Sequence, residues 1–174
     1  MRTIFLLRHA KSDWAHVDLQ DHDRPLNARG RDAAPKMAAY IEAKRYRPDL
    51  VLCSTALRTV ETFDLVKKAL GHDVEVKFEE GLYLAEQRQL LERLQWIDDK
   101  VKAVMLIGHN PGMAELAHAL SGAADDADEE KLRRRMSEKF STCALAAIEA
   151  PAKSWRALKP GSGKLKDFMR PKDL

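Results

Sequence analysis

The sequence predicts an α/β fold, in which a single domain of residues 1–174 has helices on both faces of a mostly parallel central sheet. Two observations lead to this prediction. Continuous apolar runs at residues 3–7, 50–53 and 104–107 are typical of strands that are buried on both faces. The segments between these runs carry apolar residues at spacings of three and four, which indicate helices with one buried side.

The expected elements alternate along the chain. Helices are predicted at residues 31–44, 57–70, 88–97 and 112–120, and further strands at 74–78, 144–148 and 155–158. The order of the strands in the sheet does not follow from these patterns. Between Asp125 and Arg135 acidic residues precede basic ones, and this order suits the macrodipole of a solvated helix. The tail from Lys159 onward is rich in Lys, Gly and Pro and is expected to lie over the surface.

The composition is that of an ordinary globular protein. Apolar residues make up 45% of the chain and charged residues 33%, which excludes the low-hydrophobicity signature of disorder. The formal net charge is only +3, so it favours neither a nucleic-acid partner nor a membrane partner, although a local basic pocket for an anion is compatible with it.

The cysteines and the apolar runs bear on the compartment. Cys53 and Cys143 stand in apolar surroundings without a C-x-x-C partner, which favours buried free thiols in a reducing compartment. A nucleophilic Cys53 is the weaker alternative. The N-terminal apolar run is too short for a signal peptide, and no later run approaches the roughly 18 residues of a spanning helix. We therefore expect a soluble, cytoplasmic protein.

Polar clusters follow three of the predicted strands. Arg8 and His9 end the first, residues 54–58 follow the second and close with Arg58, and His109 follows the third. Ligands of open α/β sheets bind beyond the carboxyl ends of the strands, so these clusters are expected to converge on one crevice. Taken singly, each cluster would be weak evidence, because a lone histidine after a strand is usually structural.

The combined side chains indicate an anion site. Arginine is a permanent cation with donors only, so it cannot ligate a metal, and its planar fork matches two phosphate oxygens. Arg8 and Arg58 are therefore predicted to clamp a phosphoryl group, the alternative being that one of them pairs with an acid. No cofactor and no metal are predicted. No role is assigned to His16, His22, His72 or His118, because none follows a strand end with an anion-binding partner. The run Asp21-His22-Asp23 is not read as a metal site, because consecutive residues do not easily converge on one ion.

A neutral histidine can act as a nucleophile. One histidine of the pair would attack phosphorus in line, while the other and the two arginines would hold the phosphoryl oxygens and stabilise the charge of the transition state. Water would then cleave the phosphohistidine. These residues alone leave open which of His9 and His109 is the nucleophile.

Four blocks resemble the motifs of the histidine phosphatase, or phosphoglycerate-mutase-like, superfamily. They are residues 8–14 (RHAKSDW), 25–31 (PLNARGR), 54–62 (STALRTVET) and 108–111 (GHNP), in the order in which the family has them. The resemblance implies a phosphoglycerate-mutase-like fold. It also implies that His9 is the phosphorylated nucleophile, that Arg8 and Arg58 bind phosphate, and that His109 is the second histidine of the pocket.

The expected acid carboxylate of the family has no clean motif around Glu79, Glu80 and Glu86. An alkoxide that leaves a phosphate ester needs a proton from a placed acid, whereas the imidazole of a phosphohistidine can take one from solvent. With the short length, this makes the chain similar to the small SixA-type phosphohistidine phosphatases. The implied partner is a phosphohistidine-bearing protein, such as a phosphotransfer domain. The alternatives are a phosphatase of small phosphoesters, favoured if Glu80 or Glu86 projects into the pocket, and a non-catalytic phosphate-binding module.

Overall fold

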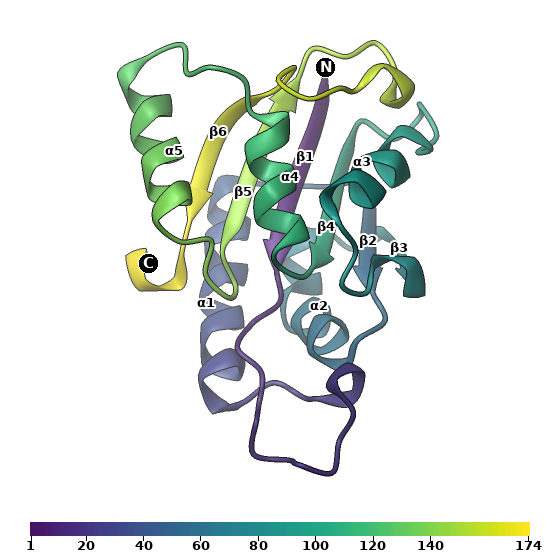
Figure 1. Cartoon of the computed structure of the whole chain (residues 1–174), viewed down its shortest axis with the longest axis vertical. Coiled ribbons are helices and arrows are strands. Elements are labelled where there is room, and N and C mark those ends of the chain that lie inside the picture. The colour runs from purple at the N-terminus through teal and green to yellow at the C-terminus, as the bar shows by residue number, and fades with distance from the viewer.

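A six-stranded sheet with the order β3-β2-β4-β1-β5-β6 forms the centre of the computed structural model, which describes residues 1–174 (Figure 1). Strands β1 to β4 are mutually parallel, whereas β5 runs antiparallel to both of its neighbours, β1 and β6. The strands are β1 (Arg2–Arg8), β2 (Leu50–Ser54), β3 (Glu75–Glu79), β4 (Ala103–Gly108), β5 (Leu145–Ala150) and β6 (Lys164–Met169).

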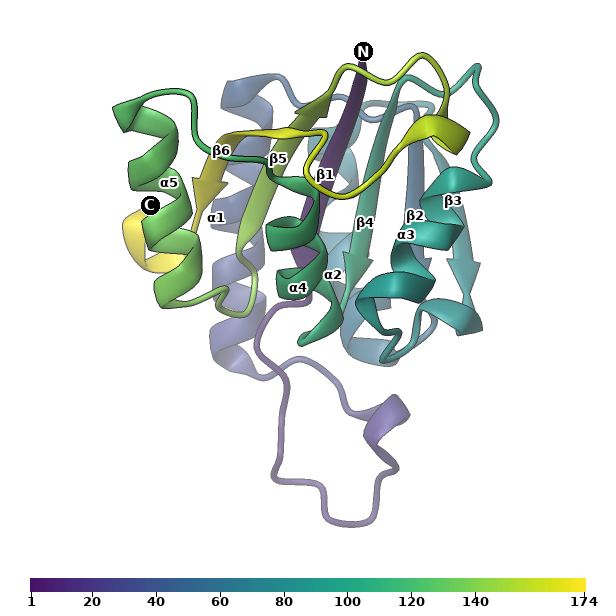
Figure 2. The same ribbon diagram turned by 45° about the horizontal axis from the view of Figure 1, so that its top comes forward.

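Helices cover both faces of this sheet, as Figures 1 and 2 show. Side chains of β1 alternate between two cores: Ile4 belongs to the cluster under α3, α4 and α5, and Phe5 to the cluster under α1 and α2. The predicted three-layer α/β/α architecture is confirmed. The helices are α1 (Ala28–Lys44), α2 (Leu57–Leu70), α3 (Gln87–Gln95), α4 (Gly112–Leu120) and α5 (Ala127–Glu138).

The connections around β1 and β4 create a crevice. These strands are neighbours, with Arg8 paired to Gly108, yet α1 and α4, which follow them, lie on opposite faces. Chains that leave adjacent strands in opposite directions open a gap at the carboxyl ends, and ligands of α/β sheets bind there. The connection from β1 to α1 projects beyond this edge of the sheet (Figure 2).

The prediction of a strand at residues 155–158 is wrong. This segment forms a short 3₁₀ helix, Trp155–Ala157, whose apolar residues fill the core rather than a sheet position. The indole of Trp155 is fully buried and its Nε1–H donates to the carbonyl of Val101 at 2.8 Å. The segment is apolar because its side chains pack into the core. The strand that follows β5 in the chain is β6, at Lys164–Met169.

The expectation of a surface tail from Lys159 is also wrong in part, because β6 lies within it. Leu165 and Phe168 are buried in the core, whereas Lys164 and Lys166 point to solvent. This edge strand has an exposed side, so its lysines obscure the apolar pattern. The helix α5 packs against it, and the buried Glu129 of α5 accepts a hydrogen bond from the backbone N–H of Leu165 at 2.9 Å. The helix predicted between Asp125 and Arg135 is therefore solvated on one side only.

Both cysteines are free and buried, as predicted. Burial raises the pKa of the Cys53 thiol and of the Cys143 thiol to about 12, so both stay protonated near neutral pH. Neither cysteine lines the cleft described below, and the alternative of a nucleophilic Cys53 loses its support. No helix has the length and apolar character needed to cross a lipid bilayer.

Candidate active site

His9 lies at the carboxyl end of β1 with 7% of its surface exposed. Its Nδ1 is 2.6 Å from the carbonyl oxygen of Ala10. A carbonyl can only accept, so Nδ1 must carry the ring proton. The neutral ring therefore keeps its lone pair on Nε2, the atom that could act as a nucleophile.

Burial and nearby cations keep this ring neutral. Desolvation lowers the pKa of His9, the bond to Ala10 opposes this, and the charges of Arg58 and Arg8 lower it further, to about 3. At neutral pH His9 is thus an unprotonated imidazole, which is the form that can attack phosphorus. The same surroundings would stabilise the negative charge of a phosphoryl group beside it.

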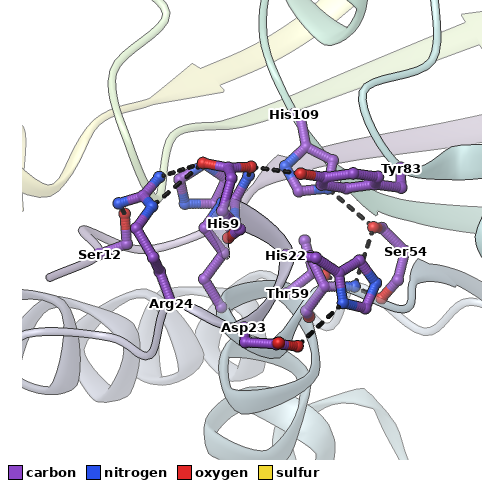
Figure 3. A network of polar contacts seen from close by, with 12 residues as sticks. His9, Ser12, His22, Asp23, Arg24, Ser54, Thr59, Tyr83 and His109 are labelled. Carbon is purple, nitrogen blue, oxygen red and sulfur yellow. Dashed lines mark hydrogen bonds and ion pairs between the residues drawn. The ribbon is translucent and has the colours of Figure 1, made fainter. Parts of the chain in front are cut away.

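His109 follows β4 and lies beside His9, with 5.4 Å between the ring centroids (Figure 3). Its Nε2 is 2.7 Å from the hydroxyl of Ser54, at the end of β2. That hydroxyl also accepts from the N–H of Ala56, and with its second lone pair and its own proton it can bond either neutral tautomer of His109. Burial and the neighbouring His9 lower the pKa of His109 to about 3. Its Nδ1 is buried and has no partner within the protein.

The two arginines predicted to clamp phosphate also reach this site. Arg8 ends β1 and donates to the carbonyl of Phe140 at 3.1 Å, and burial beside Arg58 lowers its pKa. Arg58 lies in the first turn of α2 and is buried. Its Nη1 donates to the backbone oxygen of Asp21 at 2.7 Å and its Nη2 to the carboxylate of Asp21 at 3.0 Å. Arg58 thus pairs with an acid, as the alternative states, but its buried Nε has no partner within the protein.

Asp21 was given no role by the sequence, yet its carboxylate joins three side chains at the cleft. Besides Arg58 it pairs with Arg24, at 3.0 Å, and accepts a short hydrogen bond from the Tyr83 hydroxyl. Burial opposes its ionisation, but the bond from Tyr83 and the charge of Arg58 outweigh this and lower the pKa of Asp21 to about 2. The carboxylate is an anion held among the groups predicted to receive phosphate.

Arg24 was missed as well. Its Nη1 donates to the hydroxyl of Ser12 at 2.7 Å (Figure 3). Its guanidinium lies 3.5 Å from the centroid of the Trp14 ring. The sequence did contain a signal for Arg24, because this residue directly precedes the block at residues 25–31 that resembles a family motif. Asp21 and Tyr83 carry no comparable mark, since only the folded connection between β1 and α1 brings Asp21 to the cleft.

None of the three candidate acids lines the cleft. Glu79 forms a two-point ion pair with Arg93 at 2.7 and 2.8 Å, and Glu86 takes part in the capping box of α3. The condition that would have favoured a small phosphoester, a projecting Glu80 or Glu86, is not met. The carboxylates that do line the cleft are Asp21 and Asp32.

A cleft of about 890 Å³ contains Arg8, His9, Arg58 and His109 together. The structure thus brings the four predicted site residues into one cavity. In the whole chain, four buried polar side-chain atoms lack a hydrogen-bond partner, and three of them are Nε of Arg8, Nε of Arg58 and Nδ1 of His109. Because buried donors are normally paired, their concentration here indicates a site that a ligand completes.

No group of three or more His, Cys, Asp or Glu side chains gathers anywhere in the chain at the spacing of metal ligands. In the run Asp21-His22-Asp23, His22 contacts the Thr55 hydroxyl at 2.9 Å and the Asp23 carboxylate at 3.4 Å, while Asp21 turns away towards Arg58. The prediction that the reaction needs no metal stays a prediction.

The two buried neutral histidines predict how stability depends on pH. In the unfolded chain each binds a proton with a pKa near 6.5, whereas in the folded protein it does so only near 3. Protonation therefore favours unfolding, and stability falls as the pH drops below 6.5. Between about pH 7 and about pH 5 each histidine should contribute a loss of ~2 kcal/mol. Urea unfolding at both pH values should show that the free energy of unfolding falls less in His9→Asn than in the parent, by the contribution of one histidine. Equal losses in the variant and the parent would contradict this pKa.

A second prediction concerns Asp21 as an internal competitor of phosphate. Phosphate that binds Arg58 must displace the carboxylate or approach it against its charge. Asp21→Asn should therefore strengthen competitive inhibition by inorganic phosphate about three- to tenfold. Asp23→Asn, an exposed change in the same connection, is the matched control. Weaker inhibition in Asp21→Asn alone would mean instead that the carboxylate is needed to hold Arg58.

Comparison with known proteins defines the class of this chain. The model of the histidine phosphatase superfamily (branch 1) matches residues 4–84. An Arabidopsis thaliana protein described as uncharacterized and chloroplastic is 36% identical over 98% of this chain and 78% of its own length. An uncharacterized Mycobacterium tuberculosis protein is 34% identical over 95% of this chain and 100% of its own. The chain belongs to the histidine phosphatase superfamily, as its motifs predict.

Solved structures narrow the similarity within that class. A crystal structure from Agrobacterium tumefaciens, whose protein is provisionally named phosphohistidine phosphatase SixA, has a TM-score of 0.80 and 30% identity, with 98% of both chains covered. A provisionally named SixA from Nakamurella has a TM-score of 0.78 and 25% identity, over 98% of this chain and 96% of that one. The predicted similarity to SixA-type proteins is confirmed, as is the phosphoglycerate-mutase-like fold.

Proposed function

We propose that this protein is a phosphohistidine phosphatase, which removes a phosphoryl group from a histidine of another protein through a phospho-His9 intermediate. One observation carries the proposal. His9 has a neutral ring whose proton is held on Nδ1 by Ala10, so the lone pair of Nε2 is free among cationic side chains. Nε2 of His109, in contrast, lies 2.7 Å from the Ser54 hydroxyl and is engaged in that hydrogen bond in either tautomer. This supports His9, rather than His109, as the nucleophile.

The proposed reaction has two displacements at phosphorus. Nε2 of His9 attacks, a new N–P bond forms, and the N–P bond of the substrate breaks while its imidazole takes a proton from water. A second water then attacks phospho-His9, the hydroxide left by the first step takes the proton that this water loses, and inorganic phosphate and the neutral imidazole of His9 are released. Arg8 and Arg58 hold the oxygens, His109 donates to them in the tautomer that carries its proton on Nδ1, and these donors stabilise the charge in both transition states. No step requires a metal or a cofactor.

The nature of the leaving group follows from the carboxylates. Asp21 has a pKa of about 2, so at neutral pH it has no proton to give to an alkoxide. A general acid contributes about 10²- to 10⁴-fold to such a step, and the imidazole of a phosphohistidine depends on one much less. The provisional names of the similar SixA structures support the same substrate class.

Two other functions differ in what they require. A phosphatase of small phosphoesters would need an acid that neither Glu80 nor Glu86 provides in the cleft. A binding module would hold the phosphoryl group without attack by His9. We further propose that the protein works in the cytoplasm, for which its two buried free thiols are the support. One relative, in contrast, is described as chloroplastic.

The deciding experiment compares turnover of a histidine-phosphorylated phosphotransfer domain with turnover of a panel of small phosphoesters. We expect kcat/KM to be about a hundredfold higher on the phosphohistidine, because the esters lack their acid. Faster turnover of an ester would replace the proposal by a small-molecule phosphatase. Tight binding of the phosphorylated domain without turnover would replace it by a binding module.

A further inference from the structure

The cleft extends well beyond the phosphoryl pocket. It continues between the first turns of α1, the residues that follow α5 and the last residues of the chain. Its volume of about 890 Å³ is far larger than a phosphoryl group. Additional cations line this extension and its entrance, and they take no part in the reaction proposed above: Lys11, Arg29, Lys36, Lys139, Arg170 and Lys172.

Most of these cations have no acid of their own. Arg170 pairs with Asp173 at 2.7 Å, and Lys36 pairs with Asp32 at 3.1 Å. The other four are exposed and have no carboxylate within 4.0 Å; we call them the cleft rim: Lys11, Arg29, Lys139 and Lys172. The acids that line the cleft are already engaged, Asp32 by Lys36 and Asp21 by Arg58.

The positive charge is concentrated at the cleft, because the chain as a whole is nearly balanced in charge. The formal net charge is +3, so the excess of cations at the cleft is offset by acids elsewhere. Unpaired charges of one sign around a cleft raise the local potential and steer molecules of the opposite charge towards it. The partner of the rim is therefore an anion in addition to the phosphoryl group.

We propose that the cleft rim binds acidic side chains of the substrate protein that flank its phosphohistidine. This deepens the proposed function and rests on it. Aspartate and glutamate side chains on the substrate surface would pair with the rim lysines and Arg29 while the phosphoryl group enters the pocket. The rim thereby selects phosphohistidines that stand in acidic surroundings and orients the incoming imidazole towards His9.

The form of the rim favours a protein over a small polyanion. A small-molecule site buries its ligand among convergent side chains, whereas these cations are exposed and lie on separate elements. Next to them Trp14 lines the cleft with 74% of its surface exposed, one ring face stacked on Arg24. Val17, in the same connection, is 91% exposed. Exposed aromatic side chains and arginines are enriched on surfaces that contact another protein.

The test uses two peptides that carry phosphohistidine, one flanked by Glu and Asp and one by Gln and Asn, together with free phosphohistidine. The proteins are the parent, Lys139→Gln/Lys172→Gln, Lys139→Glu/Lys172→Glu, and the control Lys68→Glu/Lys100→Glu, which changes two exposed unpaired lysines elsewhere. Rates are measured at about 0.05 M and about 0.5 M salt, because screening weakens the attraction at the higher value. Binding of the same peptides with a non-hydrolysable phosphohistidine analogue is measured in parallel by calorimetry.

We expect the parent to prefer the acidic peptide about tenfold at low salt, in both kcat/KM and binding, and to lose most of the preference at high salt. The Lys139→Glu/Lys172→Glu protein should lose the preference, Lys139→Gln/Lys172→Gln should lose part of it, and the control should keep it. Equal use of the two peptides, or an equal loss in the control, overturns the inference. If no phosphohistidine is hydrolysed, the proposed function fails. The preference for the acidic peptide in calorimetry then still decides whether the cleft rim binds acidic side chains.

Discussion

His9→Ala should abolish phosphoenzyme formation and lower turnover of a phosphohistidine substrate by at least about 10⁴-fold. The reason is the hydrogen bond to Ala10, which leaves Nε2 of His9 as the free lone pair of the site. A labelled phosphodonor, followed by a quench, should give acid-labile and alkali-stable label on the parent and none on the variant. Label on His9→Ala equal to that on the parent would show that another group is the nucleophile.

His109→Ala is the informative comparison, because the two histidines are neighbours with equal pKa values of about 3. It should keep phosphoenzyme formation and lose about 10²- to 10³-fold in rate, the usual cost of removing one donor to the transition state. His72→Ala, an exposed histidine outside the cleft, should behave as the parent. A reversal, with label on His9→Ala and none on His109→Ala, would exchange the two roles.

Arg58→Ala should lower kcat/KM by about 10³-fold, and Arg58→Lys should recover only part of it, because lysine cannot bind two oxygens with one planar group. The effect should appear both in the rate and in inhibition by inorganic phosphate, since Arg58 would hold the ground state and the transition state. Arg88→Ala, an exposed arginine on α3, is the control and should leave both unchanged. Unchanged kinetics in Arg58→Ala would remove it from the site.

Folding must be separated from catalysis in that variant, because Arg58 is buried and bonded to Asp21. Its removal leaves the Asp21 carboxylate with Arg24 and Tyr83 as partners, so the fold is expected to persist. Thermal unfolding of Arg58→Ala and of the double variant Arg58→Ala/Asp21→Asn gives the check. In the double variant the gain in phosphate affinity expected for Asp21→Asn should disappear, since it depends on Arg58.

The parts of the fold that were predictable are those with a strong local pattern. The strands β1, β2 and β4 contain continuous apolar runs because both faces of them are covered, and each run is followed by polar residues of the candidate site. The edge strand β6 was missed because its exposed lysines break the apolar run. A strand was wrongly predicted at residues 155–158 for the opposite reason: Trp155 and Leu158 are apolar because they fill the core outside the sheet.

The same contrast applies to the site. Arg8, His9, Arg58 and His109 stand directly at strand or helix ends, so their convergence follows from the topology of the sheet. Asp21 belongs to a long connection without a regular pattern, and its position depends on the three side chains that bind its carboxylate. What a motif cannot convey is this competition, in which Arg58 is held by an internal anion before any substrate arrives.

The order of the strands also determines how the chain can fold. The matched family segment, residues 4–84, contains β1, β2 and β3, but β4 lies between β1 and β2, and β5 covers the other edge of β1. The central strand of the sheet therefore has no partner until residues beyond 100 are available. Pairing at such sequence separation is entropically slow. During synthesis Arg8 and the proposed nucleophile His9 are made among the earliest residues, and they acquire a structured environment only once nearly the whole chain has emerged.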